Sequence, residues 1–127
     1  MSTNHEEIRA LFDDWNRALA TLDPDNVVAL YAPDAVLLPT VSNRVRTDHE
    51  GIRDYFSEFL GLQPQGTVQE SHVRLHGDIA LHSGVYLFHM GATGADVRAR
   101  FTFAYRHDGT RWQIIEHHSS TMPEGQD

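Results

Sequence analysis

Residues 96–121, DVRARFTFAYRHDGTRWQIIEHHSST, contain the pattern that decides the fold. Apolar and polar residues alternate through most of this stretch, which is typical of β-strands with one buried face. Asp108-Gly109 interrupts the alternation, and this dipeptide is a strong signal for a tight hairpin turn. The stretch therefore predicts two antiparallel strands, at 96–107 and 111–121, joined by a two-residue turn.

The same alternation extends upstream to about Gly66. It predicts two more strands, near 67–76 and 79–90, with Gly77-Asp78 and the segment 91–94 as turns. The second half of the chain is thus expected to form an antiparallel meander of four strands.

The start of the chain has the spacing of helices. Thr3 and Glu6 form a capping box in front of apolar residues that recur at helical spacing as far as Leu19. Asp23-Pro24 has the cap and first-turn proline of a second, short helix, whose apolar side includes Tyr31.

A short strand is expected at 35–41, before a third helix. That helix starts at Thr47 and Glu50, which again form a capping box, and ends at Gly61. Helices followed by a meander predict an α+β fold, with three N-terminal helices on a curved, mainly antiparallel sheet. The space between the helices and the sheet is the natural place for a small-molecule pocket.

Composition limits the function classes. A chain of 127 residues, 40% hydrophobic and 22% charged, predicts a single domain over 1–127 with its core at about 5–122. The net charge of -8 argues against a nucleic-acid partner, and the absence of cysteine excludes disulfides and thiolate chemistry. No run has the length of a membrane span, and the first residues lack the apolar core of a signal peptide. We expect no membrane partner and a cytoplasmic location.

The last predicted strand turns polar at its end. Side chains alternate across a strand, so His117 and Ser119 share one face, and His118 and Ser120 share the other. This is the composition expected for the wall of a polar pocket. Nine histidines also raise the question of a metal, but no His-Glu-x-x-His run is present and no carboxylate has ligand spacing. We therefore expect no metal and no other cofactor.

The predicted hairpin sets a register. A two-residue turn places Arg100 and Thr102 on the same face as His117 and Ser119. The opposite face is then large and aromatic, with Phe101, Phe103, Tyr105, Trp112 and Ile114. Either the aromatic face is the core and the other is solvated, or the aromatic face packs on a second subunit and the other lines the pocket. The pattern alone leaves both open, and with them the question of which histidine faces the pocket.

Four segments together resemble a known family. LLPTVSN at 37–43, IRDYF at 52–56, VRARFTF at 97–103 and EHHSS at 116–120 are similar to the nuclear transport factor 2-like superfamily. Within it they resemble the calcium/calmodulin-dependent kinase II association-domain-like branch, often labelled SgcJ/EcaC, and in particular the iota-class carbonic anhydrases. The similarity covers about 8 to 123.

The resemblance implies a cone-shaped fold and a pocket at the wide end of the cone. It implies a homodimer formed through the sheet, by the face that carries Phe101, Phe103, Trp112 and Ile114. Kinase association domains have pocket arginines at the positions of Tyr86, Thr102 and Ser119, so this chain departs from that pattern. Some members are metal-free and others have been described with a metal.

The iota-class pattern also implies catalytic residues. In that pattern Thr40, Tyr55, His117 and Ser119 would surround bicarbonate. We add Tyr86, Arg100 and Thr102 as further pocket residues that bind substrate around them. His117 is then expected to titrate near neutrality and to accept or relay the proton of a water molecule. The hydroxyl groups would orient that water, and Arg100 would attract the anion.

Each of these residues also has a purely structural explanation. His117 can bond a backbone carbonyl at the end of the sheet, and Tyr55 can be a core residue on an apolar helix face. The leading hypothesis is reversible hydration of CO2 without a cofactor. The alternatives are a protein that binds or tailors small molecules of secondary metabolism, and a non-catalytic association module.

Overall fold

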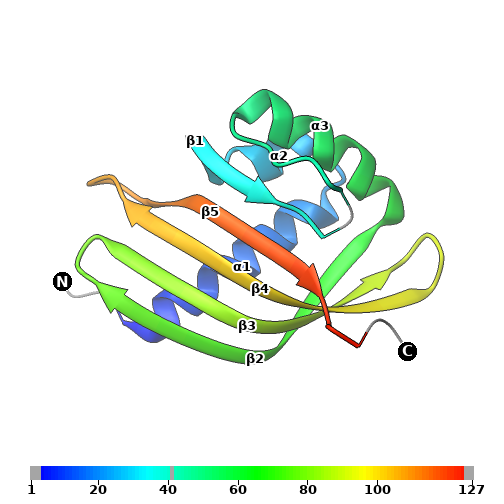
Figure 1. Cartoon of the computed structure of the whole chain (residues 1–127). Helices are drawn as coiled ribbons and strands as arrows, with labels where there is room; N and C mark the ends of the chain where they lie inside the picture. Colours follow the sequence, from blue (N-terminus) through cyan, green and yellow to red (C-terminus); the bar gives the residue numbers. More distant parts are fainter. Residues whose placement is uncertain (1–3, 41, 125–127) are drawn as a thin grey trace.

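The computed structural model of the chain describes residues 4–40 and 42–124. A five-stranded sheet in the order β1-β5-β4-β3-β2 curves around α1, and two shorter helices lie beside β1 (Figure 1). The elements are α1 (His5–Ala20), α2 (Pro24–Val28), β1 (Tyr31–Leu38), α3 (His49–Phe59), a 3-10 turn (Leu60–Leu62), β2 (Pro64–His76), β3 (Ile79–Met90), β4 (Ala95–His107) and β5 (Trp112–Thr121). β1 runs parallel to β5, and the other neighbours are antiparallel. The α+β class, with helices on a curved, mainly antiparallel sheet, is confirmed.

The long helices begin one residue later than the predicted capping boxes. The side chain of Asn4 caps α1, and that of Asp48 caps α3 by accepting a hydrogen bond from Gly51 N at 2.8 Å. The predicted cap Thr3 lies outside the described residues. At the start of α3, Asp48 rather than Thr47 is the cap, because aspartate is the stronger N-cap residue.

The strand predicted at 35–41 instead begins at Tyr31 and ends at Leu38. Tyr31 pairs with Ile114 of β5, and a register shift follows before the next pair. Pairing with a strand from the far end of the chain overrides the helical spacing that places Tyr31 on the second helix. Val41, the end of the predicted strand, lies outside the described residues.

The hairpin between β4 and β5 has a longer loop than predicted. His107 pairs with Trp112, so residues 108–111 form the loop. The Asp108 carboxylate accepts two backbone N–H groups of this loop, at 2.8 and 2.9 Å. These hydrogen bonds lower the pKa of Asp108, because they stabilise its charged form.

A β-bulge in β5 changes the facing of the strand beyond it. Tyr105 pairs with Ile114, but the next pair is Ala104 with Glu116. Ile115 is therefore an extra residue on one strand only. One extra residue moves every following side chain of β5 to the opposite face of the sheet.

The bulge makes the predicted register wrong for the functional end of β5. Phe103 pairs with His117, so His117 and Ser119 lie on the aromatic face and point toward the helices. Arg100 and Thr102 lie on the other face, where both are exposed. The predicted register did not include the extra residue Ile115 in β5. The alternation of apolar and polar residues along the strand does not indicate a bulge there.

The aromatic face of the sheet is the core of the monomer. Phe101, Phe103 and Ile114 are at most 3% exposed, and Trp112 packs at the edge of the core. Phe12 of α1 packs against the two phenylalanines, with ring centroids at 6.5 and 6.4 Å. The assignment of these side chains to a dimer interface is therefore wrong, because the chain's own helix covers them.

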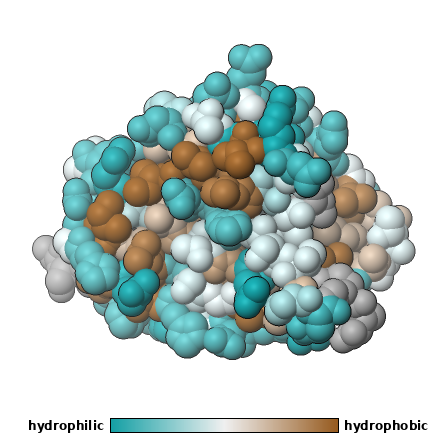
Figure 2. Space-filling view, viewed as in Figure 1, coloured by the Kyte–Doolittle hydropathy of each residue, from teal (hydrophilic) through white to brown (hydrophobic). Residues whose placement is uncertain are grey.

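The opposite face of the sheet carries half-buried apolar side chains. The alternation of β3 places Leu81, Val85 and Leu87 there. Figure 2 looks onto this face and shows hydrophobic residues gathered among hydrophilic ones. The homodimer stays a prediction, and a contact between two sheets has to use this outer face. Within the described part of the chain, no helix is long and apolar enough to cross a membrane.

β2 also contains a bulge, and it lies very close to β3. The register shifts between Val68 and Glu70. A Cβ atom at Gly84 of β3 would lie 1.9 Å from the backbone oxygen of Glu70. Only glycine allows the two backbones to approach so closely.

We expect Gly84→Ala to lower the free energy of unfolding by at least about 2 kcal/mol, because the bulge has to move to admit the methyl group. Urea unfolding followed by circular dichroism measures the change. Gly61→Ala is the matched control, since a Cβ there meets nothing within 4 Å. Equal stability of the two variants would contradict the close approach.

Candidate functional site

A small cavity lies between α1, α3 and the inner face of the sheet. The space open to water-sized molecules inside it is about 30 Å³, where one water needs on the order of 10–15 Å³. Most of the wall is aromatic or aliphatic. The polar groups are the hydroxyls and the imidazole of Thr40, Tyr55, Tyr86, His117 and Ser119. The structure thus brings together the four predicted catalytic residues and one of the three predicted to bind substrate.

The polar groups at one end of the cavity are joined by hydrogen bonds. Tyr86 donates its hydroxyl hydrogen to Ser119 Oγ at 2.6 Å, and Ser119 shares a short hydrogen bond with Thr40. The Tyr86 oxygen also lies 3.3 Å from His117 Nε2. Strands β3 and β5 and the segment that follows β1 therefore meet through side chains at this point.

The hydrogen-bonded chain continues inward from the imidazole. The Tyr31 hydroxyl lies 2.9 Å from His117 Nδ1. Trp15 of α1 donates its indole N–H to the Tyr31 oxygen at 3.2 Å. Tyr31 is completely buried and Trp15 is 1% exposed, so the inner end of the chain has no contact with solvent.

His117 is enclosed by aromatic rings. The Phe103 ring stacks on it with centroids 4.0 Å apart, and the edge of Trp15 meets it at 5.4 Å. Burial, and in second place the charge of His118, lower the pKa of His117 from 6.5 to about 3. The expectation that His117 titrates near neutrality is wrong, because its position on the buried face of the sheet disfavours the imidazolium.

Tyr55 lines the cavity from α3 and lies under a buried arginine. Burial raises the pKa of Tyr55 well above its ordinary value, and the charge of Arg46 opposes that rise. The Arg46 guanidinium carbon lies 5.5 Å from the centre of the Tyr55 ring, a cation–π distance. The Tyr55 hydroxyl therefore stays protonated and available as a donor.

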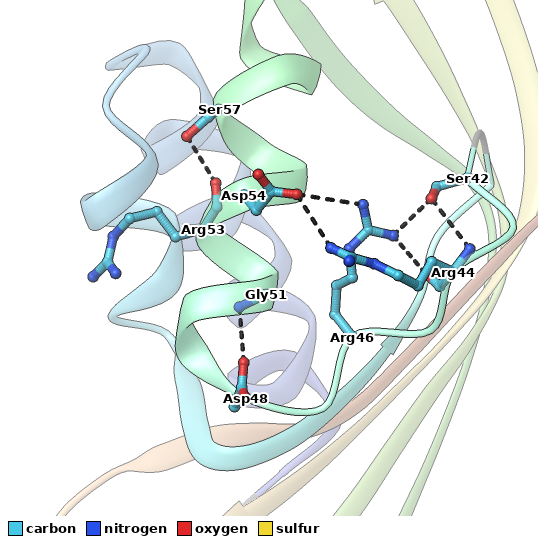
Figure 3. Close-up of polar contacts among 8 residues, drawn as sticks. All are labelled: Ser42, Arg44, Arg46, Asp48, Gly51, Arg53, Asp54 and Ser57. Atoms are coloured by element: carbon cyan, nitrogen blue, oxygen red, sulfur yellow. Dashed lines mark hydrogen bonds and ion pairs between the residues drawn. The ribbon is translucent and has the colours of Figure 1, made fainter.

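Arg46 places a positive charge next to this part of the cavity wall. Its side chain is 9% exposed and donates from Nη1 to Ser42 Oγ at 2.6 Å and to the backbone oxygen of Arg44. Its Nη2 lies 3.9 Å from the Asp54 carboxylate, which also pairs with Arg44 at 3.3 Å (Figure 3). Arg46 Nε is buried without a partner among the described residues. One shared and distant carboxylate compensates this cation only in part.

A second, open groove lies on the other side of the Thr40–Ser119 hydrogen bond. Both residues line it as well as the cavity. The groove also includes Ser42, Arg44 and His118. The pair of hydroxyls is therefore a wall shared by a partly enclosed, mostly apolar space and a more open, polar one.

Two predicted substrate-binding residues do not join the site. Arg100 and Thr102 lie on the outer face of the sheet, and neither lines the cavity or the groove. Trp15, Tyr31 and Arg46 belong to the site and were missed. Their spacing assigns Trp15 and Tyr31 to apolar helix faces, and it gives no information on the hydrogen bonds that their indole N–H and hydroxyl groups make. The signal for Arg46 was weak, because it lies in an irregular segment held by one bridge to Leu37.

The donor set of the cavity does not suit a metal ion. Its only imidazole, in the described part of the lining, has both nitrogens next to tyrosine hydroxyls, and no carboxylate lines the wall. Elsewhere in residues 4–40 and 42–124, no three histidine or carboxylate side chains group together as metal ligands. We therefore derive no step through a metal.

A second buried imidazole lies between α1 and β2. His82 is 1% exposed, and its Nε2 lies 2.8 Å from Ser71 Oγ, which also accepts a hydrogen bond from Arg9 Nε at 3.1 Å. Burial, followed by the charge of Arg9, lowers the pKa of His82 to about 4. Both buried histidines are thus neutral in the folded state at neutral pH.

The fold is that of the nuclear transport factor 2-like proteins. A Pseudomonas putida protein of that class and of unknown function superposes with a TM-score of 0.79 at 23% identity, over 95% of this chain and 90% of that one. A Novosphingobium aromaticivorans protein with a proposed assignment as an aromatic ring hydroxylase gives 0.77 at 23% identity, over 91% and 87%. At these identities the likeness shows the fold alone.

The family can be stated more closely. The family model of the calcium/calmodulin dependent protein kinase II association domain matches residues 4–123. A Xanthomonas campestris protein with a proposed assignment to that domain is 49% identical over 97% of this chain and 91% of that one, and superposes with a TM-score of 0.93. This chain belongs to the association-domain family. A search of curated proteins found no match.

The two buried histidines predict how stability changes with pH. Their folded-state pKa values are lowered, so the unfolded chain binds more protons below about pH 6.5. Their contribution to stability is complete above that pH and is lost as the pH falls toward 4 and then 3. Each histidine adds a slope of about 1.4 kcal/mol per pH unit in this range.

We expect His117→Asn to remove that part of the slope of the unfolding free energy between pH 6 and pH 4.5, and His82→Asn to do the same. Urea unfolding at several pH values measures it. His76→Asn is the control, because this histidine is exposed on the same sheet. An unchanged slope in His117→Asn would show that His117 is not neutral inside the fold.

Proposed function

We propose that this chain is a carbonic anhydrase of the iota type, which interconverts CO2 and bicarbonate without a metal. The observation that carries the proposal is the cavity of about 30 Å³, with apolar walls and a cluster of hydroxyls at one end. A linear molecule of three atoms fits this space, and apolar walls favour CO2 over water. The hydroxyls supply the hydrogen bonds that bicarbonate needs.

The hydroxyl groups can support the chemical step. A water oxygen attacks the carbon of CO2, a C–O bond forms, and negative charge grows on the CO2 oxygens. Thr40 and Ser119 share one hydrogen bond, so one hydroxyl hydrogen of this pair remains for that charge. This hydrogen and that of Tyr55 then stabilise the charge in a mostly apolar space, where hydrogen bonds are strong. The chain that holds Ser119 and Thr40 is already formed, so little reorganisation is needed in the transition state.

His117 has a different part in this proposal from the one first expected. It stays neutral and holds Tyr86 through Nε2, so we assign it a positioning role and no role as a base. The positive charge expected from Arg100 comes instead from Arg46, which lies behind Tyr55. A buried, partly compensated cation close to the cavity favours the bicarbonate anion over neutral CO2.

The size of the cavity argues against the main alternative. A polyketide-like or other aromatic metabolite is far larger than about 30 Å³ and cannot enter without a rearrangement of the aromatic wall. A non-catalytic association module has no need for five converging polar side chains in a mostly apolar cavity. The hydration of CO2 is therefore the function that the geometry supports best.

We expect purified protein to hydrate CO2 in a stopped-flow pH-indicator assay, with the same rate before and after exhaustive chelation. Ser119→Ala and Thr40→Val should each lower kcat/KM by about 100-fold or more, because each breaks the hydroxyl pair that supplies a donor to the developing charge. Ser120→Ala is the matched control, since Ser120 pairs with Arg100 and faces the outer side of the sheet.

Melting temperatures of all three variants should stay close to that of the unsubstituted protein. The absence of hydration by folded, unsubstituted protein would rule out the proposal. If chelation abolishes the hydration rate and one metal restores it, the metal-free mechanism is wrong.

A further inference from the structure

Hydration of CO2 releases one proton for each turnover, and this proton has to leave a narrow, partly enclosed cavity. The inference that follows rests on the function proposed above. Two hydrogen-bonded routes start at Ser119: one runs inward through Tyr86 to His117, and the other runs through Thr40 to the groove.

The inner route is closed at its far end. The indole N–H of Trp15 can only donate, and it donates to the Tyr31 oxygen. The Tyr31 hydroxyl hydrogen is then left for its other neighbour, His117 Nδ1, at 2.9 Å. His117 Nδ1 is thus an acceptor, and a neutral imidazole with an acceptor at Nδ1 carries its hydrogen on Nε2.

That hydrogen blocks proton uptake from the cavity. His117 Nε2–H points to the Tyr86 oxygen, and Tyr86 passes its own hydrogen on to Ser119. Every donor along this route therefore points toward the cavity, and a proton entering from Ser119 would meet a nitrogen that already carries one. Burial, which lowers the pKa of His117, acts in the same direction.

The outer route has no such obstacle. Thr40 and Ser119 form the wall between the cavity and the groove, and each hydroxyl can accept one hydrogen bond while donating another. In the described part of the groove, His118 carries the only imidazole, the group that proteins most often use to move protons. Arg44, also in the groove, has no acceptor.

We propose that the proton leaves through the Thr40–Ser119 wall and is taken up by His118. The O–H bond of the attacking water breaks as the new C–O bond forms. The proton moves by way of the two hydroxyls and groove water to the His118 imidazole, and bicarbonate remains in the cavity. The imidazolium then gives its proton to a buffer base in solution.

The surroundings of His118 suit this exchange with solvent. It is exposed, and it pairs across the sheet with Thr102 of β4 and Leu38 of β1. The charged groups next to His118 on this outer face include Glu116 of the same strand and Arg100 of β4, both exposed. Adjacent His117 and His118 thus separate two tasks: one stays neutral and positions a hydroxyl, and the other exchanges a proton with water.

The test is steady-state CO2 hydration by His118→Gln at low and high buffer concentration. We expect kcat to fall at least about tenfold in dilute buffer, with kcat/KM nearly unchanged, because proton release follows the chemical step. Added imidazole buffer should restore kcat, since a small base in the groove can replace the missing side chain. His76→Gln, which removes another exposed histidine of the sheet, is the matched control.

A second measurement is independent of activity. Long-range proton–nitrogen correlation spectra of 15N-labelled protein, assigned with His117→Asn, should show His117 neutral with its hydrogen on Nε2 across pH 6 to 8. His117 that titrates in that range, or that carries its hydrogen on Nδ1, would overturn the closed inner route.

The outcomes separate this inference from the proposed function. If the unsubstituted protein hydrates CO2 and His118→Gln keeps its full kcat in dilute buffer, the proton route is wrong and the function stands. If no variant and no unsubstituted protein hydrates CO2, both fail together. A fall in kcat that imidazole does not restore also refutes the role of His118, because it indicates damage to the fold or the wall.

Discussion

The site depends on one extra residue in β5. Ile115 forms a bulge, and the bulge moves His117 and Ser119 from the solvated face of the sheet to the buried one. Without it, the end of β5 would place its serine and histidine beside Arg100 in water. The cavity would then lose every hydrogen bond that joins β5 to β1 and β3. The energetic cost of the bulge is a local loss of strand pairing, and the aromatic contacts of His117 compensate for it in the folded chain.

Much of the fold could be predicted because its determinants are local. Alternation along 67–121 and capping residues near each helix start are properties of neighbouring residues, and they place the main elements correctly. Tyr31 shows where local information ends. Its spacing fits a helix, but the parallel pairing of β1 with β5 brings it into the sheet beside Ile114. No pattern within ten residues of Tyr31 contains that partner.

The site was predictable in composition and less so in geometry. The polar ending of the last strand pointed to His117 and Ser119, and the family resemblance added Thr40 and Tyr55; the structure gathers all four. The chemistry of His117 was not predictable, because its pKa depends on burial that only the bulge creates. The buried cation Arg46 was missed for a similar reason: an arginine in an irregular loop normally lies in water, and only packing under α3 makes it part of a cavity wall.

The sheet order has a consequence for how the chain reaches its final form. β1 has a single neighbour in the sheet, β5, which is the last strand in the sequence. While the chain is being made, β1 and the Tyr31 it carries have no strand to pair with until β5 exists, although α1 and β2 to β4 can already assemble. An unpaired strand edge invites contacts with other chains. The interval before β5 arrives is therefore the time at which this protein is most exposed to aggregation, and folding is completed by the same pairing that assembles the hydroxyl cluster.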